Sequence, residues 1–81
     1  MSDQEHSLVN EFPADKEILH RLKLEDLHYA KVAARHHELN KEIHRIEAGI
    51  EGASDERLEE LKKERLSLLD EVAEMVAAAK V

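Results

Sequence analysis

The residues best equipped for chemistry in this chain are its six histidines, three of which fall close together. His36, His37 and His44 lie in one stretch with helical periodicity. His37 and His44 would share a helix face, but about 10 Å of helix rise would separate them, which is too far for one metal ion. Zinc-binding helices use histidines four residues apart with a further ligand, and this chain has no His-x3-His pair. We therefore expect no metal and no cofactor.

A second candidate is the basic group formed by Lys62, Lys63 and Arg65. It could bind an anionic partner, although neighbouring glutamates surround it. Alternatively, Arg65 packs its aliphatic stem on an apolar seam and pairs with Glu42 or Glu64 at the rim. Both interpretations are open at this stage.

Catalytic motifs are missing from the sequence. It has no Ser/His/Asp arrangement, no glycine-rich phosphate loop and no DxD-type carboxylate cluster. A thin helical protein also offers no enclosed pocket that would shift a pKa. We expect that the protein is not an enzyme.

Apolar residues recur at alternating steps of three and four on both sides of one loop, which is the spacing of a coiled-coil seam. This predicts an all-α fold: an antiparallel two-helix coiled-coil hairpin with long helices at about 26–49 and 55–79. Gly49 and Gly52 suit the end of the first helix, and Ser54 suits the N-cap of the second. The seam residues are Tyr29, Val32, His36, Leu39, Ile43, Ile46 and Ile50, facing Leu58, Leu61, Arg65, Leu68, Val72, Met75 and Ala79.

One antiparallel register satisfies all of these layers. It pairs Ile50 with Leu58, Ile46 with Leu61, Ile43 with Arg65, Leu39 with Leu68, His36 with Val72, Val32 with Met75 and Tyr29 with Ala79. On the flanks, it brings together two attractive pairs and one repulsive pair. They are Glu47 with Lys62, Arg35 with Glu71, and Glu42 with Glu64.

Two polar residues, His36 and Arg65, occupy positions on this seam. A polar residue at a core position often fixes the register at some cost in stability. Protonation of His36 near the reference histidine pKa of ~6.5 would make its layer sensitive to pH. The alternative is that the imidazole reaches the edge of the seam and has no special role.

The segment before the hairpin divides into two parts. Residues 1–11 are polar and are expected to be flexible, and Phe12-Pro13 marks the start of a single domain over 12–81. A short amphipathic helix is expected at about 14–24. Asp26 would then cap the long helix and break the chain, which we favour, although one continuous helix also fits the pattern.

Composition narrows the classes of function. Charged residues make up 38% of the chain, the net charge is −7, and cysteine is absent. No run is long and apolar enough to cross a membrane or to act as a signal peptide, so we expect a cytoplasmic protein. The negative charge is spread along the chain and argues against nucleic-acid binding, although a role as a nucleic-acid or ribonucleoprotein accessory protein is the alternative function.

Residues over most of the chain resemble the YdcH-like family of small bacterial cytoplasmic proteins. The resemblance rests on Phe12-Pro13, Leu22-Lys23, Asp26, His28-Tyr29, His36, Leu39, Ile43, Glu47, Leu61-Lys62-Lys63, Arg65-Leu66, Leu68 and Asp70-Glu71. It implies a helical hairpin with no assigned activity. Two positions depart from the family pattern, which commonly has proline where this chain has Leu27 and lysine where it has Leu69.

A second apolar stripe lies beside the seam, and one hairpin does not need it. It consists of Ala30, Ala33, Leu66, Leu69, Ala73 and Val76. The short N-terminal helix can hide only part of this stripe, so another protein chain must cover the rest. We therefore expect protein–protein interaction, as a homo-oligomer or with another protein.

Overall fold

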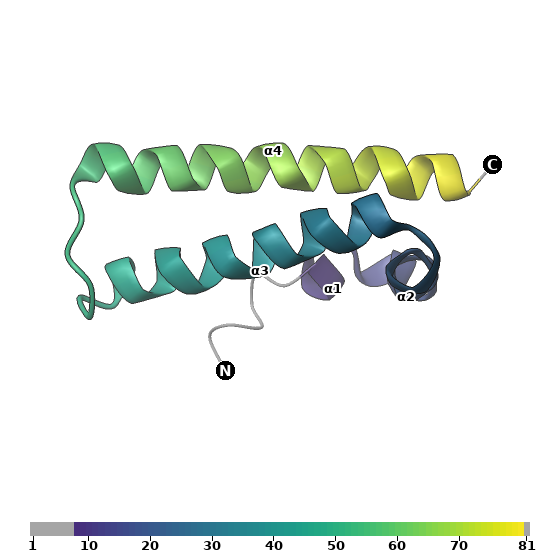
Figure 1. The fold of residues 1–81 in the computed structure, drawn as a ribbon, viewed down its shortest axis with the longest axis horizontal. Helices are drawn as coiled ribbons and strands as arrows, with labels where there is room; N and C mark the ends of the chain where they lie inside the picture. The colour runs from purple at the N-terminus through teal and green to yellow at the C-terminus, as the bar shows by residue number, and fades with distance from the viewer. Residues whose placement is uncertain (1–7, 81) are drawn as a thin grey trace.

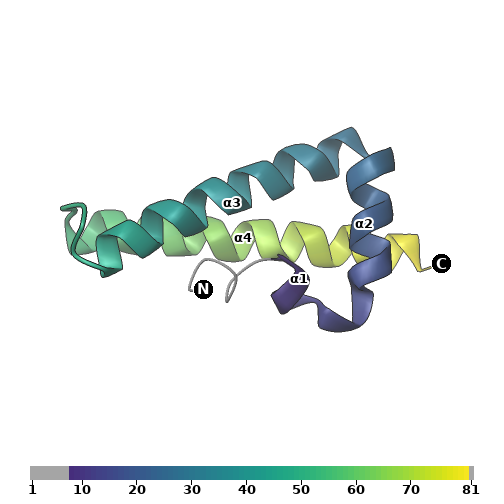
Figure 2. The ribbon, with the colours of Figure 1, turned by 90° about the horizontal axis from the view of Figure 1, so that it is seen from below.

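The described part of the chain, residues 8–80 of a computed structural model, is built from helices and connecting loops (Figure 1). The elements are α1 (Leu8–Glu11), the 3-10 helix η2 (Pro13–Asp15), α2 (Lys16–Glu25), α3 (Leu27–Glu47) and α4 (Asp55–Ala79). The two long helices, α3 and α4, pack antiparallel as a hairpin, which confirms the predicted fold. In the second view, α2 crosses the open end of the hairpin and α1 lies in front of α4 (Figure 2).

Both long helices begin at side-chain caps that the sequence predicted. The Asp26 carboxylate accepts a hydrogen bond from the Tyr29 amide at 3.1 Å, and the Ser54 hydroxyl accepts one from the Arg57 amide at 3.1 Å. Each cap satisfies a backbone donor that has no partner within its helix. Asp26 has extended backbone angles, so it ends α2 and begins α3. The chain is therefore broken there, and the continuous-helix alternative is wrong.

The hairpin loop starts earlier than expected. α3 ends at Glu47, and Gly49 adopts the left-handed conformation with φ of 78°, which a glycine reaches without steric cost. Ile50 consequently lies in the turn and is 74% exposed. The predicted layer of Ile50 with Leu58 is therefore wrong, because the helix stops one turn before Ile50.

The core consists of two apolar clusters that follow each other along the hairpin. The cluster near the loop contains Leu39, Ile43 and Leu61, with Ile46, Leu58 and Leu68 packed against them. The cluster at the open end contains Leu8, Leu19, Tyr29, Val32, Val72 and Val76, with Phe12, Ile18, Leu22, Ala33, Leu68, Leu69 and Met75 packed against them. Only the second cluster includes residues from the N-terminal segment, so α1 and α2 extend the core at one end of the hairpin.

The folded part of the chain begins before the predicted boundary at Phe12. Leu8 is 9% exposed and belongs to the cluster at the open end, so the turn at Leu8–Glu11 is part of the fold. Burying one leucine stabilises such a turn by about 1.5–3 kcal/mol. The expectation of a flexible segment over 1–11 therefore does not hold for residues 8–11, and its remainder, 1–7, lies outside the described residues.

Charged side chains join the two long helices along both flanks. On one flank, contacts repeat every seven residues: His28 with Glu71 at 3.5 Å, Arg35 with Glu64 at 2.6 Å, and Glu42 with Arg57 at 3.3 Å. On the other flank, Lys62 lies 2.9 Å from Glu47, which confirms that predicted pair.

The other two predicted flank pairs are wrong. Arg35 contacts Glu64 rather than Glu71, and Glu42 contacts Arg57 rather than Glu64. The observed pairing lies one heptad nearer the loop than expected. It replaces one repulsive pair by attractive ones, so opposite charges face each other along this flank.

Candidate functional site

The predicted interaction face is divided by the N-terminal segment. Val76 is 3% exposed and belongs to the cluster at the open end of the hairpin. Ala33 and Leu69 are half-buried and pack against the same cluster. Val76 is therefore covered from within the chain, whereas Ala33 and Leu69 are covered only in part and keep an accessible edge.

Two residues of the predicted interaction face remain exposed to solvent. Leu66 is 60% exposed on α4, and Ala73, seven residues later on the same side of that helix, is also exposed. Ala77 continues this exposed side, and the half-buried Leu69 lies between Leu66 and Ala73. We call Leu66, Leu69, Ala73 and Ala77 the α4 strip.

The structure also exposes leucines that the sequence reasoning did not assign to any interaction. Leu24 and Leu27 flank Asp26 at the corner between α2 and α3, and they are 73% and 74% exposed. Leu24 lies outside both apolar stripes, and Leu27 is a position where the sequence departs from the pattern that it otherwise resembles. The departure at Leu27 was the signal that could have marked this corner.

The two polar seam residues lie between the helices, as the heptad phase predicted. His36 is 2% exposed, and its role in fixing the register stays a prediction. Arg65 is half-buried and donates a hydrogen bond from Nη1 to the Asn40 side-chain oxygen at 3.2 Å. The expected pairing of Arg65 with Glu42 or Glu64 is wrong, because those carboxylates pair with Arg57 and Arg35.

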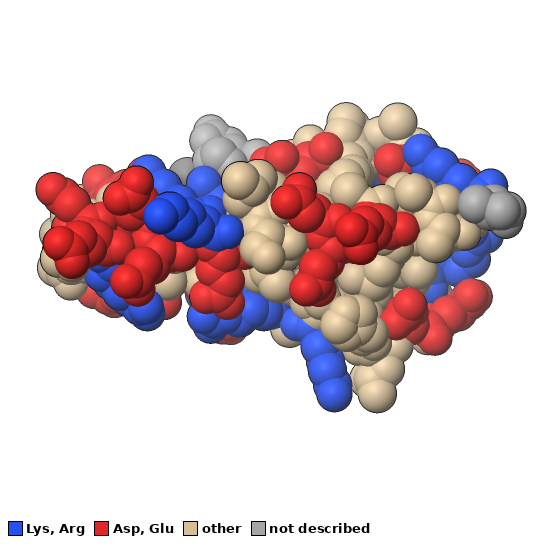
Figure 3. All heavy atoms as spheres, turned by 90° about the horizontal axis from the view of Figure 1, so that it is seen from above, with Lys and Arg blue, Asp and Glu red and all other residues tan. Residues whose placement is uncertain are grey.

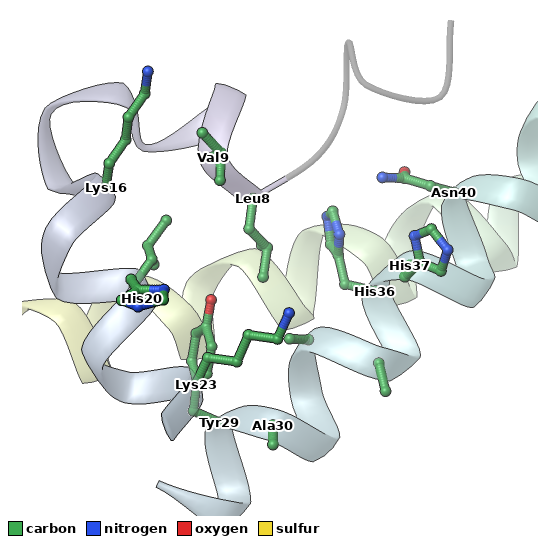
Figure 4. Close-up of a pocket in the computed structure, with 13 residues that line it drawn as sticks. Leu8, Val9, Lys16, His20, Lys23, Tyr29, Ala30, His36, His37 and Asn40 are labelled. Atoms are coloured by element: carbon green, nitrogen blue, oxygen red, sulfur yellow. The ribbon is translucent and has the colours of Figure 1, made fainter. Parts of the chain in front are cut away.

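A cavity of about 610 Å³ lies between the N-terminal helices and α3 (Figure 4). From α1 and α2 it is lined by Leu8, Val9, Lys16, Leu19, His20 and Lys23, and from α3 by Tyr29, Ala30, Ala33, Ala34, His36, His37 and Asn40. Its volume falls in the range of small-molecule sites in proteins. The cavity had no signature in the sequence, because it exists only where three helices meet.

The electrostatic character of the cavity differs from that of the whole chain. The chain has 19 acidic residues and 12 Lys or Arg, yet none of the described residues that line the cavity is acidic. Burial raises the pKa of the Tyr29 phenol, so Tyr29 stays protonated and can donate a hydrogen bond near neutral pH. The arrangement is suited to an anion, and it offers no nucleophile with an activating base.

The opposite side of the molecule has a different character (Figure 3). Acidic and basic side chains crowd the half nearer the loop, whereas uncharged residues take a larger share towards the other end.

Among residues 8–80, no group of three or more His, Asp or Glu side chains is placed to hold a metal ion. No helix in the same range is long and apolar enough to cross a membrane.

Comparisons with known proteins assign the family but no activity. Residues 30–76, more than half of the chain, match the family model described as protein of unknown function (DUF465). The match covers most of α3, the loop and most of α4, and it confirms the resemblance to YdcH-like proteins. No curated protein and no solved structure matches the chain. The chain therefore belongs to the DUF465 family of proteins of unknown function.

Proposed function

We propose that this protein acts through protein–protein interaction without catalysis, and that its first partner is a second copy of itself. The observation that carries the proposal is the α4 strip, whose largest exposed side chain, Leu66, is 60% exposed. An exposed side of a helix that repeats apolar residues over three turns is typical of a surface that another helix covers.

The composition of the α4 strip suits close helix packing. Its half nearer the C-terminus consists of Ala73 and Ala77, which would let a second helix approach closely, while Leu66 supplies most of the apolar area. Two hairpins joined through α4 about a two-fold axis would form a four-helix arrangement. In a symmetric contact, each copy buries the same strip against the other.

Net charge predicts how this association responds to salt. Each copy carries a charge of −7, so two copies repel each other at low ionic strength. Added salt screens the repulsion and leaves the apolar contact in place, so association should become stronger. Binding of this protein to nucleic acid would show the opposite dependence, because salt weakens contacts with phosphates.

Sedimentation equilibrium at tens of micromolar tests the proposal. We expect a wild-type mass above that of one chain, and a fall towards one chain for Leu66→Lys with an unchanged helical circular dichroism spectrum. Ile50→Lys is the matched control, since it also replaces a largely exposed apolar residue but lies in the loop. A wild-type mass of one chain at all concentrations, or equal effects of both variants, would reject self-association through the α4 strip.

A further inference from the structure

The lysines of the cavity between α1, α2 and α3 carry charge that no carboxylate of the described chain neutralises. Neither Lys16 nor Lys23 forms an ion pair with residues 8–80, whereas Arg35, Arg57 and Lys62 each pair with a carboxylate. Asp15 is the neighbour of Lys16 in sequence, but it pairs with Lys80 at 3.1 Å. As far as residues 8–80 are concerned, the positive charge of this cavity is therefore available to a ligand.

The cavity combines this charge with an apolar floor. Leu19 is 3% exposed at its base, and Leu8 and the alanines of α3 continue the apolar surface. Figure 4 shows the Lys23 side chain extending from α2 across to α3, with His20 at the rim and the Tyr29 hydroxyl between the helices. A ligand in this space would meet hydrogen-bond donors at the α2 side and hydrocarbon beneath.

The types of the basic residues indicate which anion fits. No described residue of the lining is an arginine, and the site has no pair of guanidinium donors that would hold a phosphate through two oxygens. Figure 4 shows the Lys16 ammonium pointing away from that of Lys23, so a head group at Lys23 meets one ammonium, which suits a monoanion. Inorganic phosphate would also leave the apolar floor uncovered.

We propose that this cavity binds a small amphipathic carboxylate, with a head group held by Lys23 and an alkyl chain lying on Leu8, Leu19 and the alanines of α3. The protonated Tyr29 phenol and His20 supply further hydrogen bonds to the head group. The site uses the side of the hairpin that α1 and α2 cover, and it does not depend on self-association through α4.

Titration of the full-length protein with decanoate, kept below its micellar concentration, tests this inference. We expect saturable binding by calorimetry and amide shifts in NMR spectra concentrated on α2 and on residues 29–40. Decanol should bind at least about tenfold more weakly, because it keeps the chain but lacks the charge that the ammonium attracts. Equal affinity for decanol and decanoate would overturn the proposal.

Variants locate the binding site. Lys23→Gln should weaken decanoate binding about tenfold, while Lys63→Gln, an exposed lysine on α4, should leave it unchanged. Ala34→Phe, at an exposed position of the lining, should reduce binding by filling the cavity while leaving the circular dichroism spectrum and the melting temperature close to those of wild type. Unchanged affinity in Lys23→Gln, or equal losses in Lys23→Gln and Lys63→Gln, would contradict the assignment.

A vesicle sedimentation experiment distinguishes binding of a monomeric ligand from binding to a lipid surface. Vesicles containing an anionic phospholipid present negative head groups on a surface too broad to enter the cavity. Binding of decanoate without sedimentation on vesicles supports the proposed site. Binding to vesicles with no binding of monomeric decanoate would overturn it.

Discussion

The Arg35–Glu64 pair shows how one residue contact joins the two long helices. The Arg35 guanidinium donates two hydrogen bonds to the Glu64 carboxylate, at 2.6 and 2.9 Å. These hydrogen bonds hold the pKa of Glu64 below its ordinary value, with a smaller Coulomb contribution from Arg35 and Arg57, while desolvation partly opposes the shift. The pair is exposed to water, so its contribution to stability is small and is sensitive to salt.

The direction of the Glu64 shift predicts how its contribution depends on pH. Because the folded-state pKa is lowered, the contribution is present above the unfolded-state pKa and is lost as pH falls through the folded-state pKa. Glu64→Gln should therefore lower the melting temperature near neutral pH, with a difference from wild type that shrinks below about pH 4. Glu60→Gln, at an exposed position, is the control. A difference between Glu64→Gln and wild type that stays constant down to pH 2 would reject the pair as its cause.

Single positions were predicted well where burial alone decides them. The heptad phase placed His36 between the helices, and the residue is 2% exposed. The partner of Arg65 was not predicted, since Asn40 lies one position after the seam residue Leu39 and was not assigned to the seam, yet it is buried and accepts the hydrogen bond. Long polar side chains can reach several acceptors, and sequence spacing does not choose among them.

Among the helices, the arrangement of α2 and α3 depends on one residue between them, Asp26. Its carboxylate caps α3 through the Tyr29 amide, and its extended backbone turns α2 away from the axis of the hairpin. This turn places Leu19 of α2 against the core and creates the cavity between α2 and α3.

Replacing Asp26 tests the cap. Asp26→Ala should reduce the free energy of unfolding by about 1 kcal/mol, because the first turn of α3 loses its side-chain acceptor. Asp26→Ser should retain most of the stability, since a hydroxyl oxygen also accepts the Tyr29 amide. Urea denaturation measures both variants, and equal losses of stability for alanine and serine would mean that the hydrogen bond is not what stabilises the start of α3.

The two long helices could be predicted because their apolar residues repeat over many turns, so that errors at single positions cancel. α1 could not be predicted, because one leucine in a polar stretch shows no periodicity. Leu8 becomes a core residue only when α2 lies across the hairpin. The predicted interaction face is only partly exposed for the same reason, namely the position of α2 across the hairpin. Sequence reasoning identified its apolar residues, but which of them the N-terminal segment covers depends on the angle at Asp26.

At the scale of the whole molecule, the protein is a rod thickened at one end. Its principal extents are 42 × 24 × 19 Å, with the N-terminal helices packed at the open end of the hairpin and a charged, two-helix part near the loop. A bare hairpin of this length buries little apolar surface, so packing of α2 supplies a substantial part of the core. This packing covers Val76, forms the cavity and leaves the α4 strip exposed, so the main surfaces of the molecule depend on it.

The stability of two leucine variants within α2 shows whether this helix packs on the hairpin. Leu19 is 3% exposed and Leu24 is 73% exposed, so the same substitution samples both sides of one helix. Urea denaturation followed by circular dichroism should show a loss of about 2–5 kcal/mol for Leu19→Ala, because a buried leucine is truncated. Leu24→Ala should change the free energy of unfolding by less than about 0.5 kcal/mol. Equal and small effects of the two variants would mean that α2 does not pack on the hairpin.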